Sequence, residues 1–268
     1  EEAIEAVKWI MIQRPFGDAG NRILIEEYLT GVEASVFAFV DGQFVSDLVA
    51  ACDYKPVNDG DVGPNTGGMG SFSSPPFWNS ELDYRVRHEI MEPTVSAMFK
   101  KGIPYRGILY AGLMLTEDGP KVIEFNCRLG DPEAQTILPK LNADLGKIIL
   151  DAVTGKLSTT SIKWSRASTV SVVVASGGYP GNYNTGYVVD GLGLVDSDIT
   201  IFHAGTKSVS TGGSEEIITN GGRVLSLMAL SDTVESARQK IYENIERISF
   251  RDSFYRSDIG ALGGRLTD

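Results

Sequence analysis

The feature that most constrains the fold is a pair of apolar, β-branched runs, residues 34–40 and 43–50, separated only by Asp41-Gly42. Asp-Gly between two such runs predicts a β-hairpin, because the tight turns that join antiparallel strands need residues that tolerate positive φ. A second strand–turn–strand pattern occupies residues 108–115 and 121–126. The chain is therefore expected to build antiparallel sheet.

Apolar residues at helical spacing add flanking helices to this sheet. We expect helices over residues 1–13, from Ser80 with a kink or division at Pro93, over 143–153 with an end at Gly155, and after a cap at Asp232. Further strands are expected at residues 23–29, 170–175, 200–202 and 224–229, and a long glycine-rich loop at about 55–74. The predicted fold class is α/β (α+β).

The composition suggests two parts and a protein that does not bind nucleic acid. A polar stretch at residues 158–166 predicts a boundary between a region 1–160 and a smaller domain 166–268. The formal charge is 24 minus 35, or −11, which disfavours phosphate-backbone binding. No apolar run approaches the roughly 18 residues of a membrane span. Two cysteines cannot form a disulfide framework, so a cytoplasmic location is the expectation.

The strand at residues 122–126 carries the first candidate site. Residues two apart on a strand share a face, so Glu124 and Asn126 project together. One carboxylate and one amide oxygen suit Mg²⁺, which completes its shell with phosphates and water. Arg128 follows closely, and a cation beside an arginine is an arrangement for phosphoryl transfer. A solvated polar strand face is the alternative interpretation.

The segment Gly60–Gly70 is the second candidate. It has five glycines in eleven residues, so its backbone N–H groups could converge on an anion, and Lys55 is the nearby cation. Neither a Walker A loop nor a dinucleotide fingerprint is present. An ordinary surface loop is the alternative.

The third candidate is the segment at residues 25–29, followed by Glu33. Its backbone could contact an adenine edge, and the acidic residue could accept from ribose hydroxyls. A surface strand with an acidic end is the alternative. The two histidines, His88 and His203, and the absence of a Gly-x-Ser-x-Gly elbow give no support to nucleophilic hydrolysis.

Taken together, these segments resemble the phosphoribosylamine–glycine ligases, also called glycinamide ribonucleotide synthetases, of the ATP-grasp superfamily. The resemblance rests on IEEYL at 25–29 with Glu33, DYK at 53–55, GPNTGGMG at 63–70 and VIEFNCRLGDPE at 122–133. YPG at 179–181, HAGT at 203–206 and TNGGRV at 219–224 resemble that family's C-terminal domain. The resemblance runs over essentially the whole chain, and it implies a partial ATP-grasp fold followed by a C-terminal mixed α/β domain.

The resemblance also implies a reaction in purine synthesis. ATP would phosphorylate the glycine carboxylate, and the amine of 5-phosphoribosylamine would attack the glycyl phosphate to give glycinamide ribonucleotide. The implied roles are these: adenine binding by Glu26, Glu27 and Leu29; ribose binding by Glu33; Mg²⁺ or Mn²⁺ binding by Glu124 and Asn126; catalysis by Arg128 and Lys55; and a substrate pocket shaped by Asn65, Thr66, Gly67, Gly68, Met69, Asp131 and Glu133.

The sequence departs from the family by lacking a counterpart of its N-terminal domain and of the first part of its ATP-grasp region. The resemblance therefore implies a fragment whose partner is the missing N-terminal part of the same polypeptide. We expect this chain alone to bind ATP weakly and not to ligate. Two other functions stay open: a different ATP-grasp carboxylate–amine ligase, and a non-catalytic module that keeps the fold.

Overall fold

The computed structural model describes residues 1–211 and 214–261, which separate into two compact units. The first unit is Glu1–Thr30, and the second begins at Gly31 and holds the rest of the described chain. Each unit is described by itself.

The first unit is a short helical segment. Helix α1 (Glu2–Lys8) continues as a π-helical turn (Trp9–Gln13), which confirms the helix predicted over residues 1–13, and a 3₁₀ turn (Gly17–Asn21) follows. The strand predicted at 23–29 is wrong, because residues 23–30, all of them described, form neither helix nor strand. A strand needs a neighbour for its N–H and C=O groups, and this unit supplies none among its described residues.

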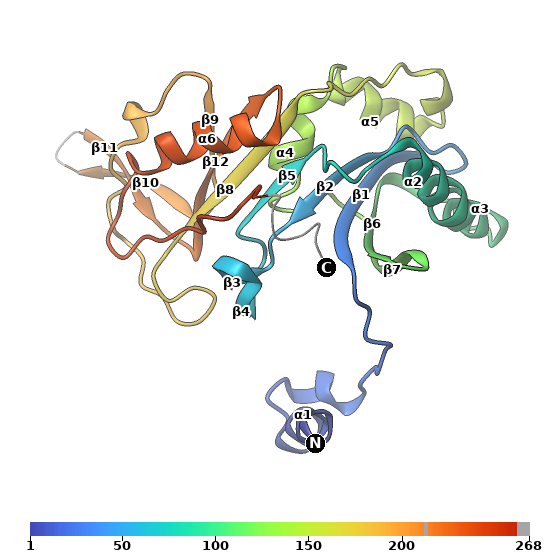
Figure 1. The fold of residues 1–268 in the computed structure, drawn as a ribbon, viewed down its shortest axis with the longest axis horizontal. Helices are drawn as coiled ribbons and strands as arrows, with labels where there is room; N and C mark the ends of the chain where they lie inside the picture. The colour runs from blue at the N-terminus through green and yellow to red at the C-terminus, as the bar shows by residue number, and fades with distance from the viewer. Residues whose placement is uncertain (212–213, 262–268) are drawn as a thin grey trace. The chain divides into compact units, whose positions relative to one another are not determined.

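The second unit is built on one eight-stranded sheet in which all neighbouring strands are antiparallel (Figure 1). The strand order is β7-β6-β1-β2-β5-β8-β12-β9. The strands are β1 (Val32–Asp41), β2 (Val49–Asp53), β5 (Gly70–Ser73), β6 (Arg106–Thr116), β7 (Gly119–Asn126), β8 (Ser168–Ala175), β9 (Ile199–His203) and β12 (Arg223–Ser231). Two small hairpins accompany it, β3 (Pro56–Asn58) with β4 (Val62–Asn65) and β10 (Thr206–Thr211) with β11 (Ser214–Thr219).

The hairpin that the Asp-Gly turn predicts is confirmed in topology and corrected in extent. β1 pairs antiparallel with β2, but β2 begins at Val49 and residue 43 is not part of it. The Asp41 Oδ1 atom accepts the Phe44 N–H at 2.9 Å, and the Ser46 Oγ atom accepts the Phe39 N–H at 2.9 Å. Backbone pairing with β1 continues as far as Ser46, whose N–H donates to the Phe39 carbonyl at 2.9 Å. The Ser46 side chain then takes the Phe39 N–H, so the second run leaves the sheet after Ser46 and rejoins it at Val49. The hairpin of β6 and β7 is confirmed.

β1 lies inside the sheet, between β6 and β2, and is buried on both faces. One face packs against the helical residues Val86 to Val95 through Val36, Ala38 and Val40. On the opposite face, Phe39 packs against Ile148. This burial explains why the run is apolar without alternation. The helices of this unit are α2 (Ser80–Arg85), a π-helical turn (Val86–Met91), α3 (Glu92–Lys100), α4 (Ala134–Ile137), α5 (Leu145–Thr154) and α6 (Val234–Ile245).

The helix predictions hold in position, but two caps differ. Asn79 caps α2 by accepting the Leu82 N–H at 2.9 Å, so Ser80 is the first helical residue and not the cap. Thr233, and not Asp232, caps α6 and forms a capping box with Ser236. Both shifts are one residue, the normal uncertainty of a cap read from sequence. α6 packs on β8 and β12, where Ile241 and Ile245 are fully buried (Figure 1).

The glycine-rich loop predicted at about 55–74 is wrong as a loop, since β3, β4 and β5 lie within it. β5 pairs with both β2 and β8, so the sheet runs without a break past residues 158–166. The division into 1–160 and 166–268 stays a prediction. None of the helices in the described residues is long and apolar enough to cross a membrane.

Candidate functional site

A small polar hollow with a cavity volume of about 10 Å³, partly open to solvent, lies where β1, β6 and β7 meet the end of β2. Its polar lining comes from four short stretches: Glu33 with Ser35, Asp53 with Lys55, Tyr110, and Glu124. In extended backbone, successive side chains point to opposite sides, so the two residues of each pair, which are two apart, point to the same side. Three residues of the predicted site, Glu33, Lys55 and Glu124, therefore line one hollow.

Glu124 and Asn126 share a face of the edge strand β7, as predicted. The Asn126 amide donates to Glu124 Oε1 at 2.9 Å. Gly112 stands opposite Glu124 in β6, and a Cβ there would lie 3.2 Å from Glu124 Cγ. A larger residue would crowd the carboxylate, so the glycine leaves room for it.

The donor set of this pair fits a hard divalent cation. Both side chains carry oxygen, and Mg²⁺ is usually held by one or two protein oxygens together with substrate phosphates and water. The described residues contain no group of three His, Cys, Asp or Glu residues able to hold a metal ion by themselves. An ion here would therefore depend on a phosphorylated ligand to complete its shell.

Lys55 forms an ion pair with Glu33, with 2.7 Å between Nζ and Oε2. Burial acts to lower the pKa of Lys55, but the hydrogen bond and charge of Glu33, with the charges of Asp53 and Glu124, outweigh it and leave that pKa raised. The ammonium is therefore kept charged inside the hollow.

Two further carboxyl groups belong to this region, Asp53 in the lining of the hollow and the buried Glu133. Burial, and next the charge of Glu133, hold the pKa of Asp53 well above its usual range. Glu133 is 3% exposed and accepts a hydrogen bond from Ser35 Oγ at 3.0 Å, and that hydroxyl also bonds Tyr110 Oη at 3.0 Å. Burial and the Glu133 charge raise the pKa of Tyr110. A site with more carboxylates than cations favours a metal ion and disfavours a bare polyphosphate.

Within the glycine-rich segment, residues 66–69 do not present their N–H groups to an anion. Thr66 N–H bonds the Lys55 carbonyl at 2.8 Å, Gly68 N–H bonds Thr66 Oγ1 at 2.9 Å, and Met69 N–H bonds the Tyr54 carbonyl at 2.8 Å. Gly67 N–H bonds Tyr179 Oη at 3.1 Å. Four consecutive donors are thus committed to protein oxygens.

The same segment is packed as a fixed wall. Met69 is fully buried. Gly68 has φ +108°, and a Cβ there would lie 2.7 Å from Asp53 Oδ1 and 2.3 Å from Pro132 Cδ. Only glycine fits this close approach, which brings the segment against the hollow. Asn65 ends β4 opposite Pro56 and is exposed.

Asp131 and Arg128 lie in the loop after β7. The Asp131 carboxylate is held on both oxygens, by Gln135 Nε2 at 2.9 Å and by Arg223 Nη2 at 3.0 Å. The exposed Arg128 side chain donates to the neighbouring Leu129 carbonyl at 3.0 Å. Asp131 is therefore anchored, while Arg128 lies on the surface of its own loop.

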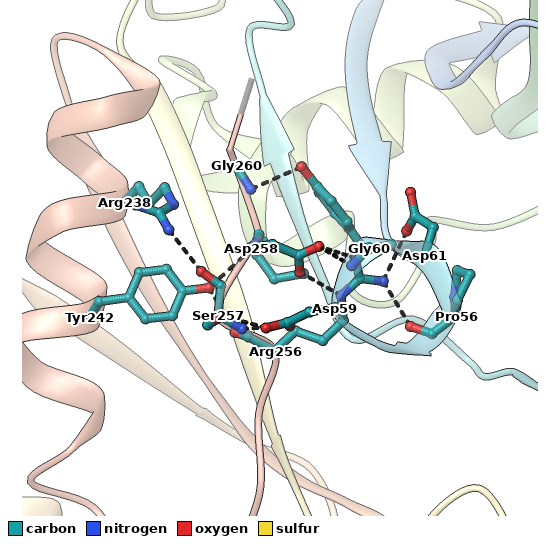
Figure 2. A network of polar contacts seen from close by, with 12 residues as sticks. Pro56, Asp59, Gly60, Asp61, Arg238, Tyr242, Arg256, Ser257, Asp258 and Gly260 are labelled. Carbon is teal, nitrogen blue, oxygen red and sulfur yellow. Dashed lines mark hydrogen bonds and ion pairs between the residues drawn. The ribbon is translucent and has the colours of Figure 1, made fainter. Parts of the chain in front are cut away.

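A second polar network fixes the β3–β4 hairpin that leads into the glycine-rich segment (Figure 2). Arg256 is 1% exposed and donates to Asp258, to Asp61 Oδ1 at 2.9 Å and to the Pro56 carbonyl at 2.8 Å. Its guanidinium also lies over the Tyr54 ring, and Tyr54 Oη accepts the Gly260 N–H at 3.0 Å. Residues near the end of the described chain thus hold this hairpin at Pro56, where it begins, and at its turn.

Sequence reasoning found part of the site and missed part of it. Glu26, Glu27 and Leu29 lie in the first unit, so their adenine role stays a prediction. Ser35, Asp53 and Tyr110 were missed, although the period-two pattern from Glu33 and Lys55 points to the first two. Arg223 was missed because its partners are about 90 and 155 residues away in sequence.

Comparisons with known proteins place the chain in a family. Residues 1–134 match the family model described as phosphoribosylglycinamide synthetase, ATP-grasp (A) domain, and residues 169–262 match that family's C domain. A biotin carboxylase domain of a thermophilic 2-oxoglutarate carboxylase shares the fold at 13% identity, with a TM-score of 0.60 over 93% of this chain and 54% of that one. The family model, with a fold that agrees, therefore defines an ATP-grasp protein.

Closer relatives narrow the class to one family. A phosphoribosylamine–glycine ligase of Allochromatium vinosum is 47% identical over 91% of this chain and 57% of its own length. One of Escherichia coli is 46% identical over 97% of this chain and 60% of its own length. The crystal structure of the Thermotoga maritima ligase, 34% identical, gives a TM-score of 0.79 over 96% of this chain and 63% of that chain.

The chain belongs to the phosphoribosylamine–glycine ligase family. It spans between 57% and 61% of the length of the curated relatives it matches.

Proposed function

We propose that this chain forms part of an ATP-dependent ligase that joins glycine to 5-phosphoribosylamine in purine synthesis. The observation that carries the proposal is the hollow that brings Glu33, Lys55 and Glu124 together beside the glycine-rich wall. The family relatives, named for this ligation, support it.

The reaction has two steps that balance in atoms and charge. The glycine carboxylate attacks the γ-phosphorus of ATP, which forms glycyl phosphate and releases ADP. The amine of 5-phosphoribosylamine then attacks the carbonyl carbon, the carbon–oxygen bond to phosphate breaks, and the amine loses a proton. Such chemistry needs positioning and charge neutralisation and no dedicated protein nucleophile.

The chain's own residues would bind and orient these groups. Lys55, kept cationic by Glu33, supplies fixed positive charge beside the transferring phosphoryl group. Arg128 leaves its contact with the Leu129 carbonyl and stabilises negative charge on the acyl phosphate. Glu33 accepts from the ribose hydroxyls. Glu26, Glu27 and Leu29 contact the adenine.

Glu124 and Asn126 would hold Mg²⁺ or Mn²⁺, which neutralises phosphate charge when bound. Their support is the shared face on β7 and the carboxyl groups that line the hollow beside them. Asp131, Glu133 and residues Asn65 to Met69 would shape the wall that faces glycine and the phosphoribosyl group.

The proposed activity belongs to the whole ligase polypeptide, because the relatives extend well beyond the region that this chain matches. The partner of this chain is then the remaining part of that polypeptide. A cytoplasmic location is proposed with it, since ATP and 5-phosphoribosylamine are small phosphorylated metabolites.

The test is product formation by the full-length polypeptide that contains this chain. We expect ADP and glycinamide ribonucleotide to form in equal amounts and only when ATP, glycine and 5-phosphoribosylamine are all present. Equal turnover with alanine or serine would favour another carboxylate–amine ligase, and ATP binding without turnover would favour a non-catalytic module. Either result overturns the proposal.

A further inference from the structure

We propose that Arg223 is a positioning residue of the ligase site, which holds the Gly67–Gly68 backbone and the Asp131 carboxylate in one fixed arrangement. The proposal rests on the proposed function, because that function makes these residues part of the substrate wall. It adds a role for β12, a strand distant in sequence from both partners.

The contacts of Arg223 join three segments of the chain. Its Nη1 atom donates to the Gly67 carbonyl at 2.8 Å, to the Asp131 carbonyl at 2.8 Å and, at 3.3 Å, to the Gly68 carbonyl. Its Nη2 atom donates to Asp131 Oδ2 at 3.0 Å. Since the side chain is only 21% exposed, these charge-assisted bonds are partly shielded from water.

The groups that Arg223 holds are also held from their other side. Gly67 donates its backbone N–H to Tyr179 Oη at 3.1 Å, while its carbonyl accepts from Arg223. Gln135 Nε2 donates to the second oxygen of Asp131 at 2.9 Å. Two side chains from the C-terminal part thus hold the two consecutive peptide groups that flank the Gly67 Cα atom.

The sequence around Arg223 is shaped for this contact. A Cβ on Gly222 would lie 2.3 Å from Tyr179 Cδ2, so glycine there lets the Tyr179 ring pack beside Arg223. A Cβ on Gly67 would lie 3.0 Å from the Arg223 guanidinium carbon. Arginine, with a planar fork of donors, can serve several oxygens at once, whereas lysine offers a single point charge.

The role follows from what the bonds constrain. With the four N–H groups of residues 66–69 already committed, the segment acts as a shaped wall rather than as an anion-binding loop. Its position relative to Asp53 and the hollow then decides how glycine and the phosphoribosyl group are oriented. A displacement of about 1 Å in such a wall can lower a rate on the order of a hundredfold.

The test compares Arg223→Met and Arg223→Lys in the full-length polypeptide. Arg247→Met is the matched control, because Arg247 also bonds an aspartate, Asp196 at 2.7 Å, and a carbonyl, that of Leu194 at 3.0 Å, within the C-terminal part. The first readout is amide hydrogen exchange at residues 66–69, which needs no substrate. We expect exchange there to become at least about tenfold faster in both Arg223 variants and to stay unchanged in the control.

The second readout is steady-state kinetics. We expect kcat/KM for glycine and for 5-phosphoribosylamine to fall at least about tenfold, while the KM for ATP stays within about twofold. Unchanged exchange at 66–69 overturns the proposal even where the rate falls. Faster exchange with wild-type kinetics also overturns it, because Arg223 would then be structural only. A wild-type protein without ligation refutes the proposed function, and the exchange data then still decide whether Arg223 holds the segment.

Discussion

Replacement of Arg256 by methionine tests how firmly the end of the chain holds the β3–β4 hairpin (Figure 2). The side chain is 1% exposed and bonds Asp258 through two nitrogens, with Asp61 and the Pro56 carbonyl as further acceptors. Methionine fills similar volume but leaves both carboxylates without this cation. Loss of one partner from a buried ion pair typically costs about 3–5 kcal/mol.

The lower end of that range applies here, because Asp258 and Asp61 are 27% and 41% exposed and can recover some hydration. We therefore expect a loss of about 3 kcal/mol, with a smaller part from the cation–π contact to Tyr54. For a domain of this size that corresponds to a melting temperature lower by about 6–12 °C.

The assay is differential scanning calorimetry of the chain, with Arg247→Met as control. Arg247 is 38% exposed in its pair with Asp196, and its loss should cost less than about 1 kcal/mol. A melting temperature for Arg256→Met within about 2 °C of the wild type would refute the reasoning, since it would mean that the buried network contributes no more than a surface pair.

Two further predictions concern the metal pair and a buried lysine. Glu124→Gln in the full-length enzyme should lower kcat at least about a hundredfold and raise the Mg²⁺ needed for half-maximal rate, whereas Glu117→Gln should do neither; steady-state rates over a Mg²⁺ series decide this. Burial lowers the pKa of Lys140 to about 8. As the pH rises, the folded state therefore loses this proton at a lower pH than the unfolded state does. The contribution of Lys140 to the free energy of unfolding then rises with pH above 8. Between pH 7 and 9.5, the free energy of unfolding of the wild type in urea should rise by about 2 kcal/mol relative to that of Lys140→Met. The same pH dependence in both proteins would contradict this prediction.

Local patterns predicted the sheet because its signals are short-range. Three of these signals depend only on residues a few positions apart: the Asp41-Gly42 turn, the placement of Glu124 and Asn126 on one face of β7, and the apolar stripe of α6. The start of β2 was misplaced because the Ser46 side chain accepts the Phe39 N–H that a continued ladder would use. No composition signal reveals such a competition in advance.

The glycine-rich segment shows where sequence patterns stop being informative. Its glycines are equally consistent with a backbone that packs closely against other segments and with N–H groups that are free to bind an anion. The structure decides for close approach, because Gly68 packs against Asp53 and Pro132 and the donors of residues 66–69 are committed. The anchor Arg223 depends on long-range packing between β12 and this segment, which no spacing rule encodes.

The most direct test of the proposed ligation follows the oxygen atoms of glycine. The full-length polypeptide is supplied with ATP, 5-phosphoribosylamine and glycine labelled with ¹⁸O in its carboxylate, and the inorganic phosphate is analysed by mass spectrometry. The glycyl phosphate route predicts one ¹⁸O atom in phosphate for each glycinamide ribonucleotide formed, because the carbon–oxygen bond breaks when the amine attacks. Product formation with unlabelled phosphate, or no product from these substrates, would contradict the account.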